Sequence, residues 1–443
     1  MDWRDLCKHK LTTAEEAVKL VRSGDTVSVA TYASTPLTLC DALFERGRAG
    51  ELTGVRVDHP APLYNWADPA ANGAFDLRAC YLTPQIREAC NSGAVGYIPV
   101  GIWKSYEVPA GFELEPDVFM VPVSPPDAKG YCSFGSGVWM SGPLSRNAKK
   151  IICEVREDFI RTYGENYIHL DQIDVMVEAT PPAAGQAAPA ALNSEEEVAA
   201  TEVICSLVAS ELVNDGDTIQ IGVGTVSSAM GLFLAGKRDL GIHTEVLTGG
   251  IVDLVKQGVV TGRYKKLHPY KVVATGVAAL PQEELNEIHE NPVFELYDFG
   301  YTDDLRIVSQ LENFVAINNA LLVDLTGQVT AESLDHRTYS GVGGQSVFMI
   351  AASYSNGGKS VSVLPSSSVP SSTGQRVSRI VPVLPTGCSV TVPRTFVDYV
   401  VTEYGIAELR GKSIQERARA LVAIAHPEMR PELERKAAEL YHA

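Results

Sequence analysis

A carboxylate occupies an unexpected position in the second half of the chain. Glu245 follows a short β-branched run in the segment GIHTEVLTGG, residues 241–250. Glutamate is depleted in ordinary strands, so Glu245 is either an exposed charge at the rim of a sheet or a reactive group of a functional site. His243 would share a strand face with Glu245, but no Asp or Ser at usable spacing completes a hydrolase triad. We interpret His243 as a packing or hydrogen-bonding residue.

Three glycine-rich passages could offer backbone N–H groups to an anion. The passage IQIGVGTV (219–226) places two glycines where a strand ends, which is where open α/β sheets bind ligands, although a tight turn explains it equally well. The passage YSGVGGQS (339–346) could stabilise an oxyanion or could be a flexible loop. The passage SYSNGGKS (353–360) joins a turn to Lys359 but lacks the spacing of a phosphate loop.

The cysteines and histidines predict neither a metal site nor a disulfide framework. The eight cysteines are scattered without CxxC spacing, and the nine histidines form no HExxH motif or ligand cluster. We expect free, mostly buried thiols and no metal.

The composition excludes several classes of protein. A hydrophobic share of 45% and a charged share of 21% are typical of a globular chain, and 443 residues predict two or three domains. The net charge of -17 argues against a nucleic-acid partner. The N-terminus MDWRDL does not resemble a secretory signal, and no apolar run approaches the ~18–20 residues of a membrane span. We expect a cytoplasmic protein without a membrane segment.

A repeat organises the elements that must position these residues. TAEEAVKLVRSGDTVSVATYAS (13–34) and TEVICSLVASELVNDGDTIQIGVGTV (201–226) each combine a helical pattern, a Gly-Asp-Thr turn and a β-branched strand. The segment 179–200, rich in Pro and Ala, predicts a linker. We therefore predict an α/β fold with mostly parallel sheets, an N-terminal domain over residues 1–180, a linker over 181–200 and a C-terminal domain over 201–443.

Further β-branched runs predict the strands of these sheets, and the last forty residues predict helix. The predicted strands are Val27 to Val29, Lys149 to Glu154, Ile173 to Glu178, Ile219 to Ile221, Ala320 to Asp324, Ser360 to Leu364, Ile380 to Leu384 and Tyr399 to Thr402.

Several motifs in one order resemble those of the acetyl-CoA hydrolase/transferase family, which includes butyryl-CoA:acetate and 4-hydroxybutyrate CoA-transferases. The resemblance covers nearly the whole chain. The matching stretches are VSPPDAKGYCSFG (123–135), DGDTIQIGVGT, LGIHTEVLTGGIVDLVKQGVV, VDLTGQVTAES (323–333), YSGVGGQ, GGKSVSVLPS, VSRIVP and YVVTEYGIAELRGKSIQERARALVAIAHPE.

The resemblance implies two tandem CoA-transferase α/β domains with the active site between them, and it gives the candidate residues their roles. The glutamate of the family's G-[IV]-H-[ST]-E motif is the nucleophile, which corresponds to Glu245. It would form a mixed anhydride and then a glutamyl-CoA thioester, with ping-pong kinetics. The oxyanion and acyl site would comprise Gly343, Gly344, Gln345 and Val347, and the CoA-binding residues would be Gly222, Val223, Gly224, Thr225, Gly343 and Lys359.

The chain departs from the family pattern near the expected acyl site. After GVGGQ the family reads V-D-F-x-R-G, whereas Val347 and Ile350 stand here in place of the Asp and the Arg, and the segment 297–306 is atypical. Since Arg is a natural partner of a carboxylate, we expect a less polar site and a different acyl acceptor from acetate.

Three functions stay open on the sequence: a CoA-transferase with a medium or unusual acyl group, an acyl-CoA hydrolase or other acyl-transfer enzyme that uses the same glutamate, and a CoA-binding protein without turnover. The expected ligands are an acyl-CoA and a small carboxylate, with coenzyme A as a substrate and no tightly bound cofactor. We expect a homodimer or homotetramer.

Overall fold

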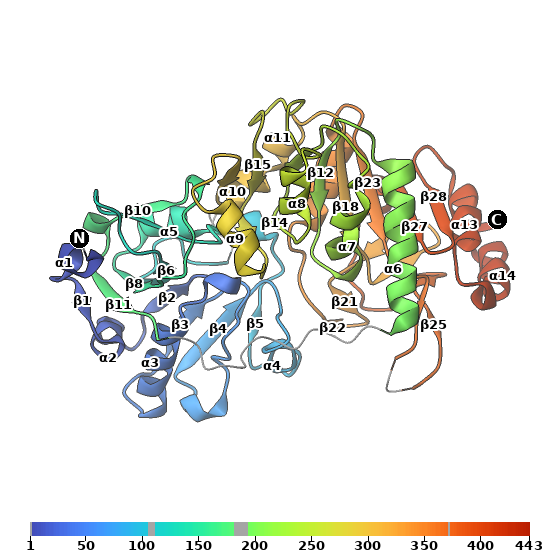
Figure 1. Cartoon of the computed structure of the whole chain (residues 1–443). Coiled ribbons are helices and arrows are strands. Elements are labelled where there is room, and N and C mark those ends of the chain that lie inside the picture. Colours follow the sequence, from blue (N-terminus) through green and yellow to red (C-terminus); the bar gives the residue numbers. More distant parts are fainter. Residues whose placement is uncertain (1, 105–110, 181–193, 371–372) are drawn as a thin grey trace. The chain divides into compact units, whose positions relative to one another are not determined.

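The computed structural model describes residues 2–104, 111–180, 194–370 and 373–443 (Figure 1). The chain forms two compact units. Unit 1 comprises Met1–Pro189 with Ala274–Thr302, and unit 2 comprises Ala190–Val273 with Asp303–Ala443. The segment 274–302 therefore groups with the N-terminal part of the chain. The predicted domain boundaries stay a prediction, since residues 181–193 of the predicted linker lie outside the described residues.

Unit 1 contains an eight-stranded sheet in which every neighbouring pair is parallel. Its central strands are buried along their whole length, as strands covered on both faces are expected to be. Across the sheet the order is β1 (Leu11–Thr12), β11 (Val175–Glu178), β8 (Ile151–Val155), β6 (Val118–Val123), β2 (Thr26–Val29), β3 (Val55–Asp58), β4 (Phe75–Ala79) and β5 (Gly96–Tyr97).

Unit 2 contains a second sheet, which is parallel except for one edge strand that pairs antiparallel to its neighbour. Within unit 2 the order of its strands is β28 (Gly405–Glu408), β27 (Tyr399–Thr402), β23 (Lys359–Val363), β18 (Phe314–Asn319), β12 (Thr218–Ile221), β13 (Gly241–His243) and β15 (Val272–Ala274). The predicted fold class, α/β with mostly parallel sheets, is confirmed.

The two copies of the sequence repeat occupy equivalent places in the two sheets. In unit 1, β2 lies between β6 and β3, and in unit 2, β12 lies between β18 and β13 (Figure 1). The turn before each strand contains a glycine with nearly the same positive φ, 83° at Gly24 and 81° at Gly216. Since only glycine adopts that conformation readily, the Gly-Asp-Thr turn is a structural part of the repeat.

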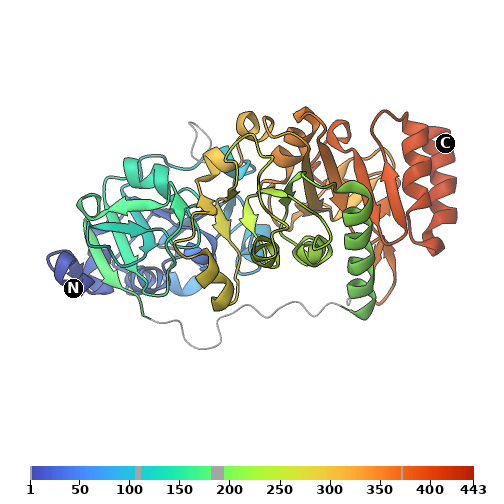
Figure 2. The ribbon, with the colours of Figure 1, turned by 45° about the horizontal axis from the view of Figure 1, so that its top comes forward.

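Helices cover both sheets. In unit 1 they are α1 (Trp3–Cys7), α2 (Ala14–Ala17), α3 (Leu37–Arg48), α4 (Arg87–Asn91), α5 (Ser141–Asn147), α9 (Gln282–Ile288) and α10 (Phe299–Thr302). In unit 2 they are α6 (Glu195–Leu207), α7 (Thr225–Phe233), α8 (Ile251–Lys256), α11 (Leu305–Val308), α12 (Gln345–Tyr354), α13 (Ile414–Ala423) and α14 (Arg430–Tyr441). The last two lie side by side, as Figure 2 shows, which confirms the helical C-terminus.

The end of the predicted linker is helical. Ser194 and Glu197 form a capping box, in which the Ser194 hydroxyl accepts a hydrogen bond from the Glu197 N–H and the Glu197 carboxylate accepts one from the Ser194 N–H. This reciprocal cap satisfies two backbone donors, so α6 begins at Glu195, within the segment that the sequence assigned to the linker.

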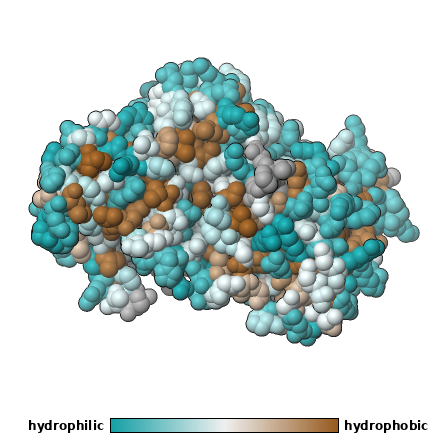
Figure 3. Space-filling model, turned by 180° about the vertical axis from the view of Figure 1, so that it is seen from behind, coloured by the Kyte–Doolittle hydropathy of each residue, from teal (hydrophilic) through white to brown (hydrophobic). Residues whose placement is uncertain are grey.

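The other face of the molecule, in Figure 3, is mostly hydrophilic, with hydrophobic patches separated by polar surface. Across the described ranges, no helix combines the length and the apolar character needed to span a bilayer. All eight cysteines are free thiols.

Candidate active site

Glu245 lies just beyond the carboxyl end of β13, in the short connection to β14 (Val246–Leu247). The preceding residue, Thr244, is buried and fixes this connection. Its N–H donates to the carbonyl of Val273 (3.0 Å), and its hydroxyl donates to the carbonyl of Ile221 (3.1 Å). Both neighbouring strands therefore hold the backbone that presents Glu245 at the carboxyl edge of the sheet, where ligands of parallel sheets bind.

The backbone of Gly344 contacts the Glu245 carboxylate directly. The Gly344 N–H donates a hydrogen bond to Oε2 of Glu245 (2.9 Å). Burial raises the pKa of Glu245 to about 7, and this hydrogen bond opposes the rise because it stabilises the charged form. Burial therefore favours the carboxylic acid of Glu245, whereas the Gly344 N–H favours its carboxylate.

Close packing explains why residue 344 is a glycine. Its φ of -88° and ψ of -8° are open to any residue, but a Cβ there would lie 2.3 Å from Oε2 of Glu245, 2.7 Å from Oδ2 of Asp303 and 2.9 Å from the ring of Phe348. The structure thus adds the fully buried Asp303 to the surroundings of Glu245. The sequence pointed to this residue only through the atypical segment 297–306.

The start of α12 carries the other candidates for the oxyanion and acyl site. Gly343 has a φ of 55°, a conformation that favours glycine, and brings the chain into the helix. Nε2 of Gln345 is buried and has no hydrogen-bond partner among the described residues, so a substrate oxygen is a fitting acceptor. Val347 is 2% exposed and adds an apolar side chain two residues further along the helix.

The other glycine loop follows β12 at the same edge of the sheet as Glu245. Two asparagines at the end of β18 contact this loop, and no sequence motif indicated them. A Cβ at Gly222 would lie 2.4 Å from Oδ1 of Asn318, and Asn319 donates from Nδ2 to the carbonyl of Val223 (3.2 Å). Gly224 has a φ of 151° and leads directly into α7, which begins at Thr225, while Val223 is 62% exposed. The loop thus presents its backbone and an exposed valine.

Lys359 does not lie at the carboxyl edge of the unit 2 sheet, where Glu245 and the glycine loop after β12 lie. Lys359 is the first residue of β23 and therefore lies at the amino edge of the parallel sheet, opposite the residues that follow β12 and β13. Its Nζ donates to the carbonyl of Leu212 (2.7 Å) and lies 3.9 Å from Asp217. Its predicted role in CoA binding does not fit this position, because a side chain at the amino edge points away from the glycine loops.

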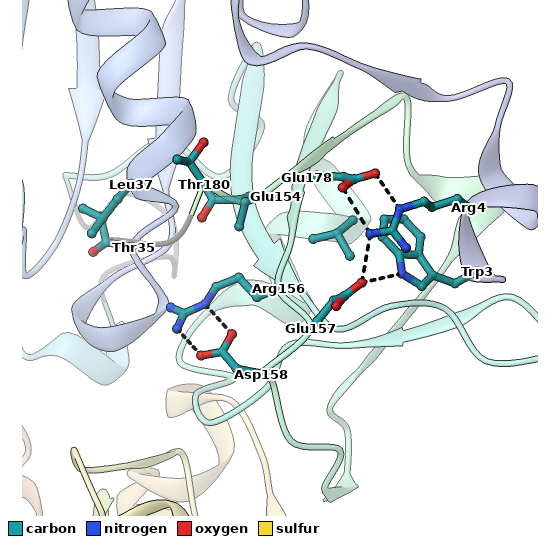
Figure 4. Close-up of a pocket in the computed structure, with 12 residues that line it drawn as sticks. Trp3, Arg4, Thr35, Leu37, Glu154, Arg156, Glu157, Asp158, Glu178 and Thr180 are labelled. Carbon is teal, nitrogen blue, oxygen red and sulfur yellow. Dashed lines mark hydrogen bonds and ion pairs between the residues drawn. The ribbon is translucent and has the colours of Figure 1, made fainter. Parts of the chain in front are cut away.

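A cavity of about 380 Å³ in unit 1 is lined by residues outside the predicted site. Figure 4 shows that the two arginines in it face carboxylates: Arg4 pairs with Glu157 and Glu178, and Arg156 pairs with Asp158. Because these ion pairs occupy the guanidinium groups, the cavity presents no obvious site for an anion. Across the described segments, no group of three His, Cys, Asp or Glu side chains could hold a metal ion.

Comparisons with known proteins place the chain in a family. It matches the acetyl-CoA hydrolase/transferase N-terminal domain over residues 1–182 and the C-terminal domain of the same family over residues 281–437. It is 36% identical over 438 residues to a 4-hydroxybutyrate coenzyme A transferase of Clostridium kluyveri, covering 98% of each chain. It is 35% identical to a succinyl-CoA:cyclohexane-1-carboxylate CoA transferase of Geobacter metallireducens, covering 96% of this chain and 94% of the relative.

A solved structure agrees with these matches. The crystal structure of RipA from Yersinia pestis superimposes with a TM-score of 0.89 at 34% identity and covers both chains completely. The predicted enzyme class, CoA-transferase, is that of the named relatives. The chain belongs to the acetyl-CoA hydrolase/transferase family, as its motifs predict.

Proposed function

We propose that this protein transfers CoA between an acyl-CoA and a free carboxylate, with Glu245 as the nucleophile. The observation that carries the proposal is the half-buried carboxylate of Glu245 at the carboxyl edge of the sheet, which accepts a hydrogen bond from the Gly344 N–H. The CoA-transferases among the relatives support the reaction class. The acyl group is proposed to be apolar or of medium size, because Val347 and Ile350 stand where the family pattern has an Asp and an Arg.

The hydrogen bond from Gly344 distinguishes the two oxygens of Glu245. Oε2 is held by the N–H, so Oε1 is the oxygen that attacks the thioester carbonyl. The C–S bond breaks, CoA leaves as the thiolate, and Glu245 becomes one side of a mixed anhydride. The thiolate then attacks Cδ of Glu245, which expels the substrate carboxylate together with Oε1 and leaves a glutamyl-CoA thioester.

Oε2 stays on Glu245 throughout and takes the negative charge whenever Cδ is attacked. The Gly344 N–H lies 2.9 Å from this oxygen in the resting protein and is already aimed at it. A donor held in place before the charge develops is worth about 3–4 kcal/mol to such a step. Attack on the thioester by the acceptor carboxylate, followed by return of the thiolate, reverses the sequence and releases the new acyl-CoA.

The surrounding loops supply binding groups for this chemistry. The glycine loop at residues 222–224 offers backbone N–H groups to CoA, and Gln345 offers its amide to an acyl or acceptor oxygen. Water has to be excluded from the thioester, because its attack would give hydrolysis instead of transfer. An assembly of two or four chains is part of the same proposal and is testable by light scattering.

Intact-mass measurement tests the proposal. Incubation with a panel of acyl-CoAs and no acceptor is expected to add the mass of CoA, less one water, to the protein and to release the free carboxylate. Glu245→Ala is expected to abolish the adduct, whereas Glu202→Ala, which alters an exposed glutamate of α6, keeps it. Continuous thiol release without an acceptor would instead identify a hydrolase, and neither adduct nor thiol release with any acyl-CoA would contradict both enzymatic functions.

A further inference from the structure

The glycine loop after β12, residues 222–224, is bound to the end of β18 at two points. The Gly222 N–H donates to the carbonyl of Ile317 (2.9 Å), one residue beyond the paired part of β12. One residue further along the loop, Nδ2 of Asn319 donates to the carbonyl of Val223 (3.2 Å). A side-chain amide thus continues the contacts between the two strands beyond the end of β12.

The hydrogen bond from Asn319 depends on a glycine at position 224. The Gly224 backbone has a φ of 151° and a ψ of 172°, a conformation that is essentially restricted to glycine. A Cβ at this position would lie 2.3 Å from Nδ2 of Asn319, the same atom that donates to Val223. The amide therefore occupies the space that a side chain at residue 224 would need.

The bond to Val223 also sets the direction of the next N–H group. The Val223 carbonyl and the Gly224 N–H belong to one planar trans peptide, in which the two groups point in opposite directions. Because the carbonyl points at the Asn319 amide, the Gly224 N–H points away from it. This N–H lies at the carboxyl edge of the sheet, just before α7 begins at Thr225, which is where parallel sheets bind ligands.

Resting on the proposed function, in which the loop 222–224 binds CoA, we propose that Asn319 is a positioning residue for CoA. It holds the peptide between Val223 and Gly224 so that the Gly224 N–H is directed at an oxygen of CoA. Without the amide, this peptide is free to rotate, and CoA binding then has to order it, which weakens the affinity. The reaction at Glu245 is expected to proceed at its normal rate once CoA is bound, because Asn319 acts through the loop.

The adjacent Asn318 has a different, structural role. Its buried amide pairs reciprocally with that of Gln220: Nε2 of Gln220 donates to Oδ1 of Asn318 (3.2 Å), and Nδ2 of Asn318 donates to Oε1 of Gln220 (2.8 Å). It meets the loop through close packing, since a Cβ at Gly222 would lie 2.4 Å from Oδ1. Asn318→Ala leaves Gln220 buried without this partner and is expected to lower the unfolding temperature. Asn319 is partly exposed, and its replacement is expected to act on CoA binding.

Asn319→Leu keeps a neutral, branched side chain of similar size and removes the donor. Calorimetry is expected to show that the variant binds CoA about three- to tenfold more weakly than the wild type, which is the effect of one hydrogen bond. In adduct formation, the acyl-CoA concentration that gives half the maximal rate is expected to rise by a similar factor, while the rate at saturation stays within about twofold. Asn147→Ala is the matched control. Asn147 of α5 also donates from Nδ2 to a backbone carbonyl, that of Pro143 (2.9 Å), and its loss is expected to leave CoA binding unchanged.

The outcomes separate this inference from the proposed function. Absence of CoA binding in the wild type would overturn both. If the wild type binds CoA but forms no adduct, the role of Glu245 fails, and weaker CoA binding by Asn319→Leu still supports the role of Asn319. An unchanged affinity in Asn319→Leu, or a lower rate at saturation without a change in affinity, would overturn the role of Asn319 and leave the proposed function intact. Thermal unfolding verifies that the variant is folded. If Asn319→Leu does not fold, Asn319→Ser, whose hydroxyl lies one bond closer to the backbone, carries the same expectation.

Discussion

Substitution of Gly344 by alanine tests the close approach on which the site depends. The new Cβ would meet Oε2 of Glu245 at 2.3 Å and Oδ2 of Asp303 at 2.7 Å, whereas ordinary contacts of a Cβ begin near 3.4 Å. The Glu245 carboxylate must therefore retreat by about 1 Å, which breaks its 2.9 Å hydrogen bond to the residue 344 N–H. Loss of an oxyanion donor costs about 3–4 kcal/mol, so the rate of adduct formation is expected to fall about 10²- to 10³-fold.

Stability is expected to respond differently from the rate. Residue 344 has helical φ and ψ, at which alanine stabilises a fold by about 0.4–1 kcal/mol by restricting the unfolded chain, and the local clash offsets this gain. Gly344→Ala is thus expected to unfold within a few degrees of the wild type while it loses the adduct. Gly236→Ala is the matched control, because a Cβ there meets nothing within 4 Å. Adduct formation by Gly344→Ala within threefold of the control, about 0.6 kcal/mol, would refute the reasoning.

Two further substitutions test the glycine loop and a buried carboxyl group of unit 1. Gly224→Ala would place a side chain on a backbone with a φ of 151°, and its Cβ would lie 2.3 Å from Nδ2 of Asn319. Calorimetry is therefore expected to show that CoA binds at least about tenfold more weakly, which corresponds to about 1.4 kcal/mol. An unchanged affinity for CoA would exclude this loop from the CoA site. Burial raises the pKa of Glu154 in the folded protein to about 7, above the value of about 4.5 in the unfolded chain. As the pH rises from about 4.5 to about 7, the unfolded chain ionises more readily than the folded protein, so the free energy of unfolding falls. Glu154→Gln cannot ionise and therefore does not show this fall. Between pH 5 and pH 8, urea unfolding is expected to show the free energy of unfolding of the variant rising by up to about 3 kcal/mol relative to that of the wild type. The same pH dependence of unfolding in both proteins would contradict this expectation.

The sequence was informative where a local pattern determines the structure. The repeat predicted two parallel sheets because a helix, a Gly-Asp-Thr turn and a β-branched strand are all local features. Two central strands, β6 and β18, were nevertheless missed. The first contains Pro122, which argues against a central strand, and the second ends in the polar pair Asn318 and Asn319. In both strands, burial between covering layers outweighs residue preference.

The sequence was less informative where the site depends on which edge of a sheet a residue reaches. Lys359 follows two glycines, as a ligand-binding lysine can, but β23 begins at this residue and so turns it toward the amino edge. Asp303 lies far from Glu245 in sequence and belongs to no motif that the chain shares with the family. Only the packing of Gly344 against both carboxylates shows that Asp303 lies beside Glu245.

The contacts of Oε2 also separate the chemistry from the choice of substrate. In the proposed mechanism Oε1 leaves with the substrate carboxylate, whereas Oε2 remains on Glu245 and always faces Gly344 and Asp303. Interactions with Oε2 are then the same for every acyl group, because that oxygen never belongs to the substrate. Changes at Gly344 are therefore expected to lower turnover by a similar factor for all acyl-CoAs. A change at Val347, which is proposed to belong to the acyl site, is by contrast expected to alter the order of preference among acyl-CoAs, since such a site discriminates by the size and polarity of the acyl group.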